Sequence, residues 1–182
     1  MANELIIKCC APTLAGLKVG SIFCLGKDFY KMGGELKECV EILKAKGLEV
    51  KGIRGCKGQR LIYVYRPKEL KRQLCNRSNA CILKDFGYNT DSTEEAVKTL
   101  LKKIRYENEF PHEIGIFLGY PPEDVLGYIK NSGKNFLLSG MWKVYADTDK
   151  AEKSFQAYKK CTNVYMKCYQ KGITLDKLTV RK

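Results

Sequence analysis

Residues 48–66, LEVKGIRGCKGQRLIYVYR, carry the pattern that decides the fold class of this chain. Two runs rich in β-forming residues, LEVKGI and RLIYVYR, flank the segment RGCKGQ, whose glycines suit a turn. The pattern predicts an antiparallel hairpin. A helical stripe that ends at Gly47 precedes it, and a segment with a helical pattern, KELKRQL, follows Pro67. Helices on both sides of a hairpin indicate a mixed α/β fold.

The rest of the chain continues this alternation. The clearest helix begins at STEE, where Ser92 as N-cap and Glu95 three residues later form a capping box. The other expected elements are a short first helix followed by a turn, a buried strand in KVGSIFCL (18–25), a second short helix in NRSNACILKDFG (76–87), a buried strand in EIGIFLGY (113–120), a helix opened by proline in PPEDVLGYIKN (121–131), a strand in GMWKVYAD (140–147) and a long helix from about Thr148 to Lys171.

We therefore expect an α/β (mixed α+β) fold in which helices cover a mixed sheet of about five strands, including the hairpin. The strands that contain Ile22 and Ile116 should share this sheet, since each is a short apolar run ended by glycine. A chain of 182 residues with 45% hydrophobic residues has the composition of one ordinary globular domain. Residues 1–182 are therefore predicted to form a single domain.

Several classes of protein are disfavoured by composition. The apolar N-terminal stretch is interrupted by Lys8, Pro12 and Lys18, so we expect neither a signal peptide nor a membrane span. We therefore expect the protein to be cytoplasmic. Nine cysteines, an odd number without a C-x-x-C spacing, indicate reduced thiols. With one histidine in the chain, no metal site is expected. The sequence indicates no particular cofactor or oligomeric state.

The most distinctive segment is PHEIGIFLGYPPED, residues 111–124. Histidine followed by glutamate resembles a zinc-protease motif, but Ile116 stands where H-E-x-x-H needs its second histidine. His112 could act as a general base, or His112 and Glu113 could cap an element. Tyr120 could stack on a ligand or be a buried turn residue.

The double proline in the same segment bears on ligand charge. Pro121 and Pro122 remove two N–H donors from a helix N-terminus, while Glu123 and Asp124 compensate its dipole. This end should therefore reject a phosphate and suit a cationic, amide or hydroxyl-bearing group.

A second candidate site lies in CCAPTLAGLK, residues 9–18. Cys10, Thr13 and Lys18 could form a reactive thiol site, because a nearby cation lowers a thiol pKa. Alternatively, the segment is only a turn leading into the next strand.

A third candidate is electrostatic. The chain has a formal net charge of +13, and residues 51–77 carry nine basic side chains against one acid, Glu69. Tyr63 and Tyr65 could stack on bases if they face outward. The alternative is a solvated lysine-rich surface, with Tyr63 and Tyr65, which alternate with Ile62 and Val64, in the core. The nucleic-acid candidates are Arg54, Lys57, Arg60 and Arg72.

The motifs together resemble an uncharacterised bacterial family, catalogued as domain of unknown function 3793. The resemblance rests on PHEIGIFLGYPPEDV with CAPTLAGLK upstream, VYRP in the hairpin and GMWKVYAD downstream, and it covers nearly the whole chain. It implies a small cytoplasmic domain but no activity. Met141 departs from the family pattern, which often has Tyr there. The matching positions are Cys10, Pro12, Thr13, Leu14, Gly16, Lys18, His112, Glu113, Gly119, Tyr120, Pro121 and Asp124.

Two functions are compatible with these observations. The preferred one is a small-molecule-binding protein or enzyme with a pocket formed by residues 10–18 and 112–124. The alternative is a nucleic-acid-binding or protein-interaction module that uses residues 51–77.

Overall fold

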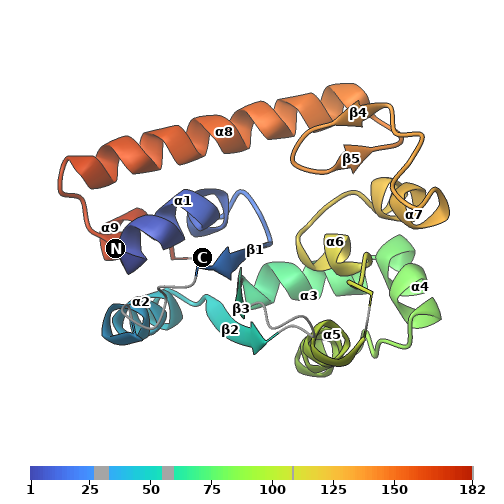
Figure 1. Ribbon diagram of the computed structural model, residues 1–182, viewed down its shortest axis with the longest axis horizontal. Coiled ribbons are helices and arrows are strands. Elements are labelled where there is room, and N and C mark those ends of the chain that lie inside the picture. Colours follow the sequence, from blue (N-terminus) through green and yellow to red (C-terminus); the bar gives the residue numbers. More distant parts are fainter. Residues whose placement is uncertain (27–32, 55–59, 108, 182) are drawn as a thin grey trace. The chain divides into compact units, whose positions relative to one another are not determined.

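The computed structural model describes residues 1–26, 33–54, 60–107 and 109–181. It separates into two compact units, and we describe each by itself (Figure 1). Unit 1 comprises residues 1–67 and 158–182, and unit 2 comprises residues 68–157. The elements are α1 (Ala2–Leu14), β1 (Gly20–Leu25), α2 (Gly33–Ala45), β2 (Glu49–Arg54), β3 (Arg60–Tyr65), α3 (Pro67–Cys75), α4 (Arg77–Asp85), α5 (Thr93–Tyr106), α6 (Ile114–Phe117), α7 (Pro122–Lys130), β4 (Leu138–Ser139), β5 (Lys143–Val144), α8 (Thr148–Gln170) and α9 (Leu175–Leu178).

Unit 1 contains a three-stranded antiparallel sheet in the order β1-β3-β2. The predicted hairpin is confirmed, with Glu49 opposite Tyr65 and Arg54 opposite Arg60, and β1 pairs with the other edge of β3. The residues of its turn, 55–59, lie outside the described part of the chain. The mixed α+β class is therefore confirmed, but the expectation of one mixed sheet of about five strands is wrong. Strands β4 and β5 form a separate antiparallel pair in unit 2.

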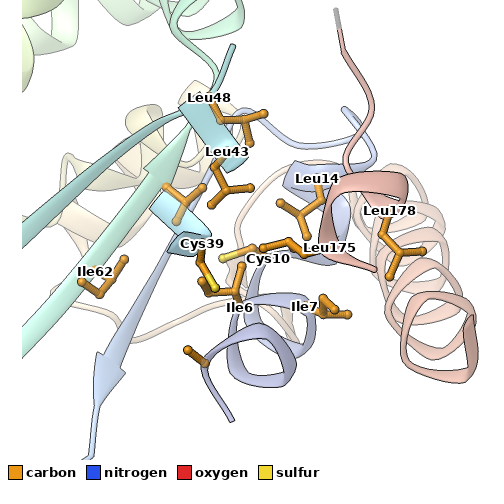
Figure 2. Packing of buried hydrophobic residues seen from close by; sticks show 12 residues of the cluster. Ile6, Ile7, Cys10, Leu14, Cys39, Leu43, Leu48, Ile62, Leu175 and Leu178 are labelled. Carbon is orange, nitrogen blue, oxygen red and sulfur yellow. The ribbon is translucent and has the colours of Figure 1, made fainter. Parts of the chain in front are cut away.

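The core of unit 1 lies between this sheet and the helices at both ends of the chain (Figure 2). Side chains from α1, α2 and α9 meet those of β3, so residues far apart in sequence share one apolar cluster. Part of α8 adds partly buried residues around it, such as Tyr165 and Met166. The cluster consists of Ala2, Ile6, Ile7, Cys10, Leu14, Cys39, Leu43, Leu48, Ile62, Val64, Leu175 and Leu178.

The segment CAPTLAGLK, predicted as a turn, is helical in its first half. Cys10 to Leu14 belong to α1, with Pro12 inside the last turn of the helix. The turn begins after them, where Gly16 adopts a φ of +73° and the N–H groups of Leu17 and Lys18 donate to the Pro12 carbonyl. A glycine in this left-handed conformation is the usual way to end a helix.

Unit 2 is mainly helical. The predicted N-cap of α5 is confirmed, because the Ser92 hydroxyl accepts a hydrogen bond from the Glu95 N–H. Asn76 caps α4 in the same manner, with its side chain accepting from Ser78 and Asn79. Helix α7 begins at Pro122, as the double proline predicts.

The predicted strand in EIGIFLGY is wrong, because Ile114–Phe117 form the one-turn helix α6. The backbone N–H of Ile114 donates to the Pro111 carbonyl and that of Gly115 donates to the His112 carbonyl. With Ile116 in a helix, the expectation that it shares a sheet with Ile22 is also wrong. All four residues of α6 are buried. A helical turn that is buried on every side has a continuous apolar sequence, and so has a buried strand, which is why the sequence pattern does not distinguish them.

Across the described residues, no helix has the length and apolar character needed to cross a lipid bilayer.

Candidate functional site

The candidate site is built around the corner between α6 and α7 in unit 2. Gly119 ends α6 with a φ of +81°, and the Tyr120 N–H donates to the Gly115 carbonyl. A Cβ on Gly115 would lie 2.7 Å from a methyl carbon of Val125 on α7, so the absent side chain is what lets the two helices approach. This close packing fixes the position of the Tyr120 ring.

Asp124 connects the first turn of α7 to the segment around β5. Its carboxylate is buried and accepts three hydrogen bonds, from Trp142 Nε1 at 2.8 Å, the Tyr145 N–H at 2.7 Å and the Ala146 N–H at 3.2 Å. Hydrogen bonds to an ionised group are stronger than neutral ones. Asp124 therefore holds the indole of Trp142 and the chain that follows it in place.

Three aromatic rings continue from this anchor. The Trp142 ring stacks on Tyr120 with centroids 4.7 Å apart and packs edge-on against Phe155 with centroids 4.5 Å apart. A Cβ on Gly140 would come within 2.5 Å of the Phe155 ring, so only glycine permits this packing. The stack gives the site a rigid aromatic wall.

Tyr120, Asp124 and Trp142 line a cavity of about 330 Å³ whose lining residues all belong to unit 2. Its volume falls in the lower part of the range of small-molecule sites, about 300–1,000 Å³. Phe110 and Met141 are 45% and 48% exposed, so they border solvent as well as the cavity. The lining residues are Phe110, His112, Ile114, Gly115, Tyr120, Asp124, Val125, Tyr128, Ser139, Gly140, Met141, Trp142 and Lys143.

Lys143 contributes the cationic side chain of the lining. Its ammonium donates to the Gly133 carbonyl and lies 5.7 Å from the Tyr128 ring centroid and 4.8 Å from that of Phe136. His112 lines the same cavity, with its ring 4.7 Å from that of Tyr128. Within the described part of the chain, the contacts of Lys143 include no carboxylate.

Comparison with known proteins shows to which family the chain belongs. The family model described as protein of unknown function (DUF3793) matches residues 6–179. The chain belongs to this family. No curated protein and no solved structure gives a significant match. The DUF3793 resemblance seen in the sequence is confirmed, and two of its segments, around His112 and around Trp142, contribute to the cavity.

The predicted site residues of the second DUF3793 segment divide into two groups. His112, Tyr120 and Asp124 line the cavity. Glu113 does not, because its buried carboxylate accepts a hydrogen bond from the Tyr88 hydroxyl at 2.9 Å and lies 3.6 Å from Lys103 Nζ. Glu113 therefore fastens the start of α6 to neighbouring elements of unit 2.

The residues of the first DUF3793 segment, Cys10, Thr13 and Lys18, belong to unit 1. Cys10 is fully buried, and burial raises the pKa of its thiol far above the ordinary value, with the nearby Lys18 offsetting only part of this. The thiolate needed for a reactive cysteine is thus disfavoured. The Thr13 and Ser21 hydroxyls are 2.8 Å apart and share a hydrogen bond. Burial lowers the pKa of Lys18 to about 8.

The basic candidates are also divided between the units. Arg54 and Arg60 face each other across the hairpin of unit 1, whereas Arg72 in unit 2 donates to both carboxylate oxygens of Glu69. Lys57 lies outside the described residues.

Of the two placements left open for Tyr63 and Tyr65, on the surface or in the core, the structure has the buried one. Tyr63 and Tyr65 are 0% and 4% exposed, and they stack on each other with centroids 4.7 Å apart. The suggestion that these rings face outward to stack on bases is therefore wrong.

Sequence reasoning missed several lining residues, notably Tyr128, Ser139, Trp142 and Lys143. One signal was present: Trp142 is the chain's only tryptophan and lies in a segment that resembles the family. The pattern of its segment predicts only a strand. In the described ranges, no cluster of three or more His, Cys, Asp or Glu side chains is arranged to hold a metal ion.

Proposed function

We propose that unit 2 binds a small molecule with a flat, apolar body in the cavity between α6, α7 and the β4–β5 pair. The observation that carries the proposal is the aromatic lining: Phe110, His112, Tyr120, Tyr128 and Trp142 all contribute rings to one cavity of about 330 Å³. Pockets for organic ligands are typically lined this way, with few polar groups that set orientation.

The chemistry of the lining supports binding over catalysis. General-base and nucleophilic catalysis use a base that is hydrogen-bonded to its partner. Among the described residues, His112 has a ring contact with Tyr128 but no hydrogen-bonded acid or nucleophile. Asp124 already accepts three hydrogen bonds from the protein.

This proposal keeps the second of the two segments that the sequence indicated. Participation of Cys10, Thr13 and Lys18 in a ligand site stays a prediction. The alternative, a nucleic-acid-binding or protein-interaction module that uses Arg54, Lys57, Arg60 and Arg72, also stays a prediction. A salt titration with DNA and RNA oligomers would test nucleic-acid binding, since phosphate contacts give steep salt dependence.

The experiment for the proposed function is calorimetric titration with naphthamide, a flat neutral probe. Ser139→Phe places a ring in the cavity lining, and Leu137→Phe is the matched control because Leu137 is 64% exposed and outside the lining. We expect saturable binding, with a dissociation constant below about 1 mM, to the natural chain and to the control, and loss of binding in Ser139→Phe.

Equal binding by Ser139→Phe and the natural chain would contradict the proposal. So would the absence of saturable binding by the natural chain to naphthamide and to its acid, naphthoate.

A further inference from the structure

The charges around the cavity indicate which ligand it favours. Within the described part of the chain, its lining includes one carboxylate, that of Asp124, and one ammonium, that of Lys143. The two side chains differ in how far hydrogen bonds within the protein already compensate their charges. This difference determines whether the cavity favours an anionic or a cationic ligand.

The negative charge of Asp124 is largely compensated. One carboxylate oxygen accepts from the Trp142 indole N–H, and the other accepts from the backbone N–H groups of Tyr145 and Ala146. A buried carboxylate with three such donors has little left to offer a cationic ligand.

Among the residues that the structure describes, the positive charge of Lys143 has no comparable partner. A carbonyl and two ring faces position the ammonium, yet these groups carry no formal charge. An ammonium has three N–H donors, and one is used by the Gly133 carbonyl. The remaining donors can bind an anion, and the low polarity of the surrounding rings strengthens that attraction.

We propose that the ligand of this cavity is a flat aromatic carboxylic acid whose carboxylate binds Lys143. This inference rests on the proposed function and narrows it to a ligand class. It revises the sequence-based preference for a cationic, amide or hydroxyl-bearing group, which considered the N-terminus of α7 alone. That end still offers no anion site, and Lys143 supplies one from β5.

The test compares naphthoate with naphthamide, which have the same ring system and nearly the same shape but differ in charge. Four proteins are titrated by calorimetry: the natural chain, Lys143→Gln, Lys143→Arg and a control. The matched control is Lys134→Gln. Lys134 is an exposed lysine of the loop between α7 and β4, and it does not line the cavity.

We expect the natural chain and Lys134→Gln to bind naphthoate at least about tenfold more tightly than naphthamide, as one charge-assisted hydrogen bond provides. Lys143→Gln should lose this preference while its affinity for naphthamide stays within about twofold. Lys143→Arg should keep the preference. Thermal unfolding of each variant verifies that the comparison is between folded proteins.

Equal affinity for both probes in the natural chain would overturn the carboxylate assignment but leave the proposed cavity intact. An unchanged preference in a folded Lys143→Gln would also overturn it. If neither probe bound the natural chain, the proposed function itself would fail.

Discussion

At the scale of single residues, the cavity depends on a few side chains whose polar groups form hydrogen bonds within the protein. Asp124 illustrates this, since its carboxylate orients Trp142 without needing to touch a ligand. The sequence indicated Asp124 as a ligand-binding candidate because acids near a helix N-terminus are visible in a motif. Its three donors come from residues 18 to 22 positions later, and no local pattern reveals such contacts.

The first prediction concerns this anchor. Asp124→Asn replaces one acceptor oxygen by an N–H donor that faces N–H groups, so we expect it to lower the free energy of unfolding by about 2–4 kcal/mol. The near-ultraviolet circular dichroism of Trp142 should weaken at the same time. Denaturant unfolding measures the first effect, with Glu123→Gln as the exposed control. A change below about 0.5 kcal/mol in Asp124→Asn would show that the three hydrogen bonds do not anchor the site.

The second prediction concerns Lys18 and pH. Burial lowers the pKa of Lys18 to about 8 from 10.5, so between these values the unfolded chain binds more protons than the folded one. The free energy of unfolding should therefore rise with pH across this window. Lys18→Met should remove that rise, and relative to this variant the natural chain should gain stability above about pH 8.

Denaturant unfolding below, within and above the window measures this difference, with the exposed Lys37→Met as control. Parallel pH profiles for the natural chain and Lys18→Met would refute the assignment.

At the scale of elements, local signals predicted most helices and the hairpin. The Ser92 cap, the double proline before α7 and the glycine-terminated stripe of α2 are short-range features, and each marks an element that the structure contains. Helix α6 was missed because β-branched and aromatic residues in a short run fit a buried strand and a buried helical turn equally well. The sequence also did not predict which strands share a sheet, since pairing between distant segments depends on packing that no single segment encodes.

The third prediction tests packing between α7 and the segment after β5. A Cβ at Gly127 would lie 2.5 Å from the Cβ of Tyr145, an atom close to the backbone that cannot easily move. Gly127→Ala should therefore cost about 1–3 kcal/mol from steric overlap, although alanine favours helices. Gly34→Ala in α2 is the matched control, because no atom lies within 4 Å of the added methyl group.

Gly34→Ala should not destabilise, and because Gly34 lies in the first turn of α2, any gain should stay below the roughly 0.5–1 kcal/mol of a helix interior. Thermal and denaturant unfolding distinguish the two outcomes. Stabilisation by Gly127→Ala would mean that Tyr145 does not pack against this face of α7.

At the scale of the whole molecule, unit 1 is assembled from both ends of the chain. Arg66 connects them, since its buried guanidinium donates to the carbonyls of Thr13, Leu14 and Val180. The sequence grouped Arg66 with a surface charge cluster, because composition shows charge but not burial. Its partners lie up to 114 positions away, so only the assembled fold reveals its role.

The fourth prediction follows from this connection. Arg66→Met removes the guanidinium donor from three carbonyl oxygens, of which those of Thr13 and Leu14 keep a backbone donor, and we expect it to lower the free energy of unfolding by about 3–5 kcal/mol. Arg54→Met is the control, because Arg54 is exposed. Hydrogen exchange at Val180, whose N–H donates to the Leu14 carbonyl, should accelerate in Arg66→Met. If Arg66→Met were as stable as the control, Arg66 would not be what holds the two ends of the chain together in unit 1.

The proposed function places a flat small molecule in the cavity of unit 2, beside Trp142. Because this is the only tryptophan, replacing it biosynthetically by fluorotryptophan gives a single fluorine NMR signal that reports directly on the cavity. Titration with naphthoate should shift or broaden this signal in a saturable way in the natural chain and in Leu137→Phe, but leave it unchanged in Ser139→Phe. A signal that stays unaffected in the natural chain while calorimetry detects naphthoate binding would place the binding site elsewhere and contradict the account.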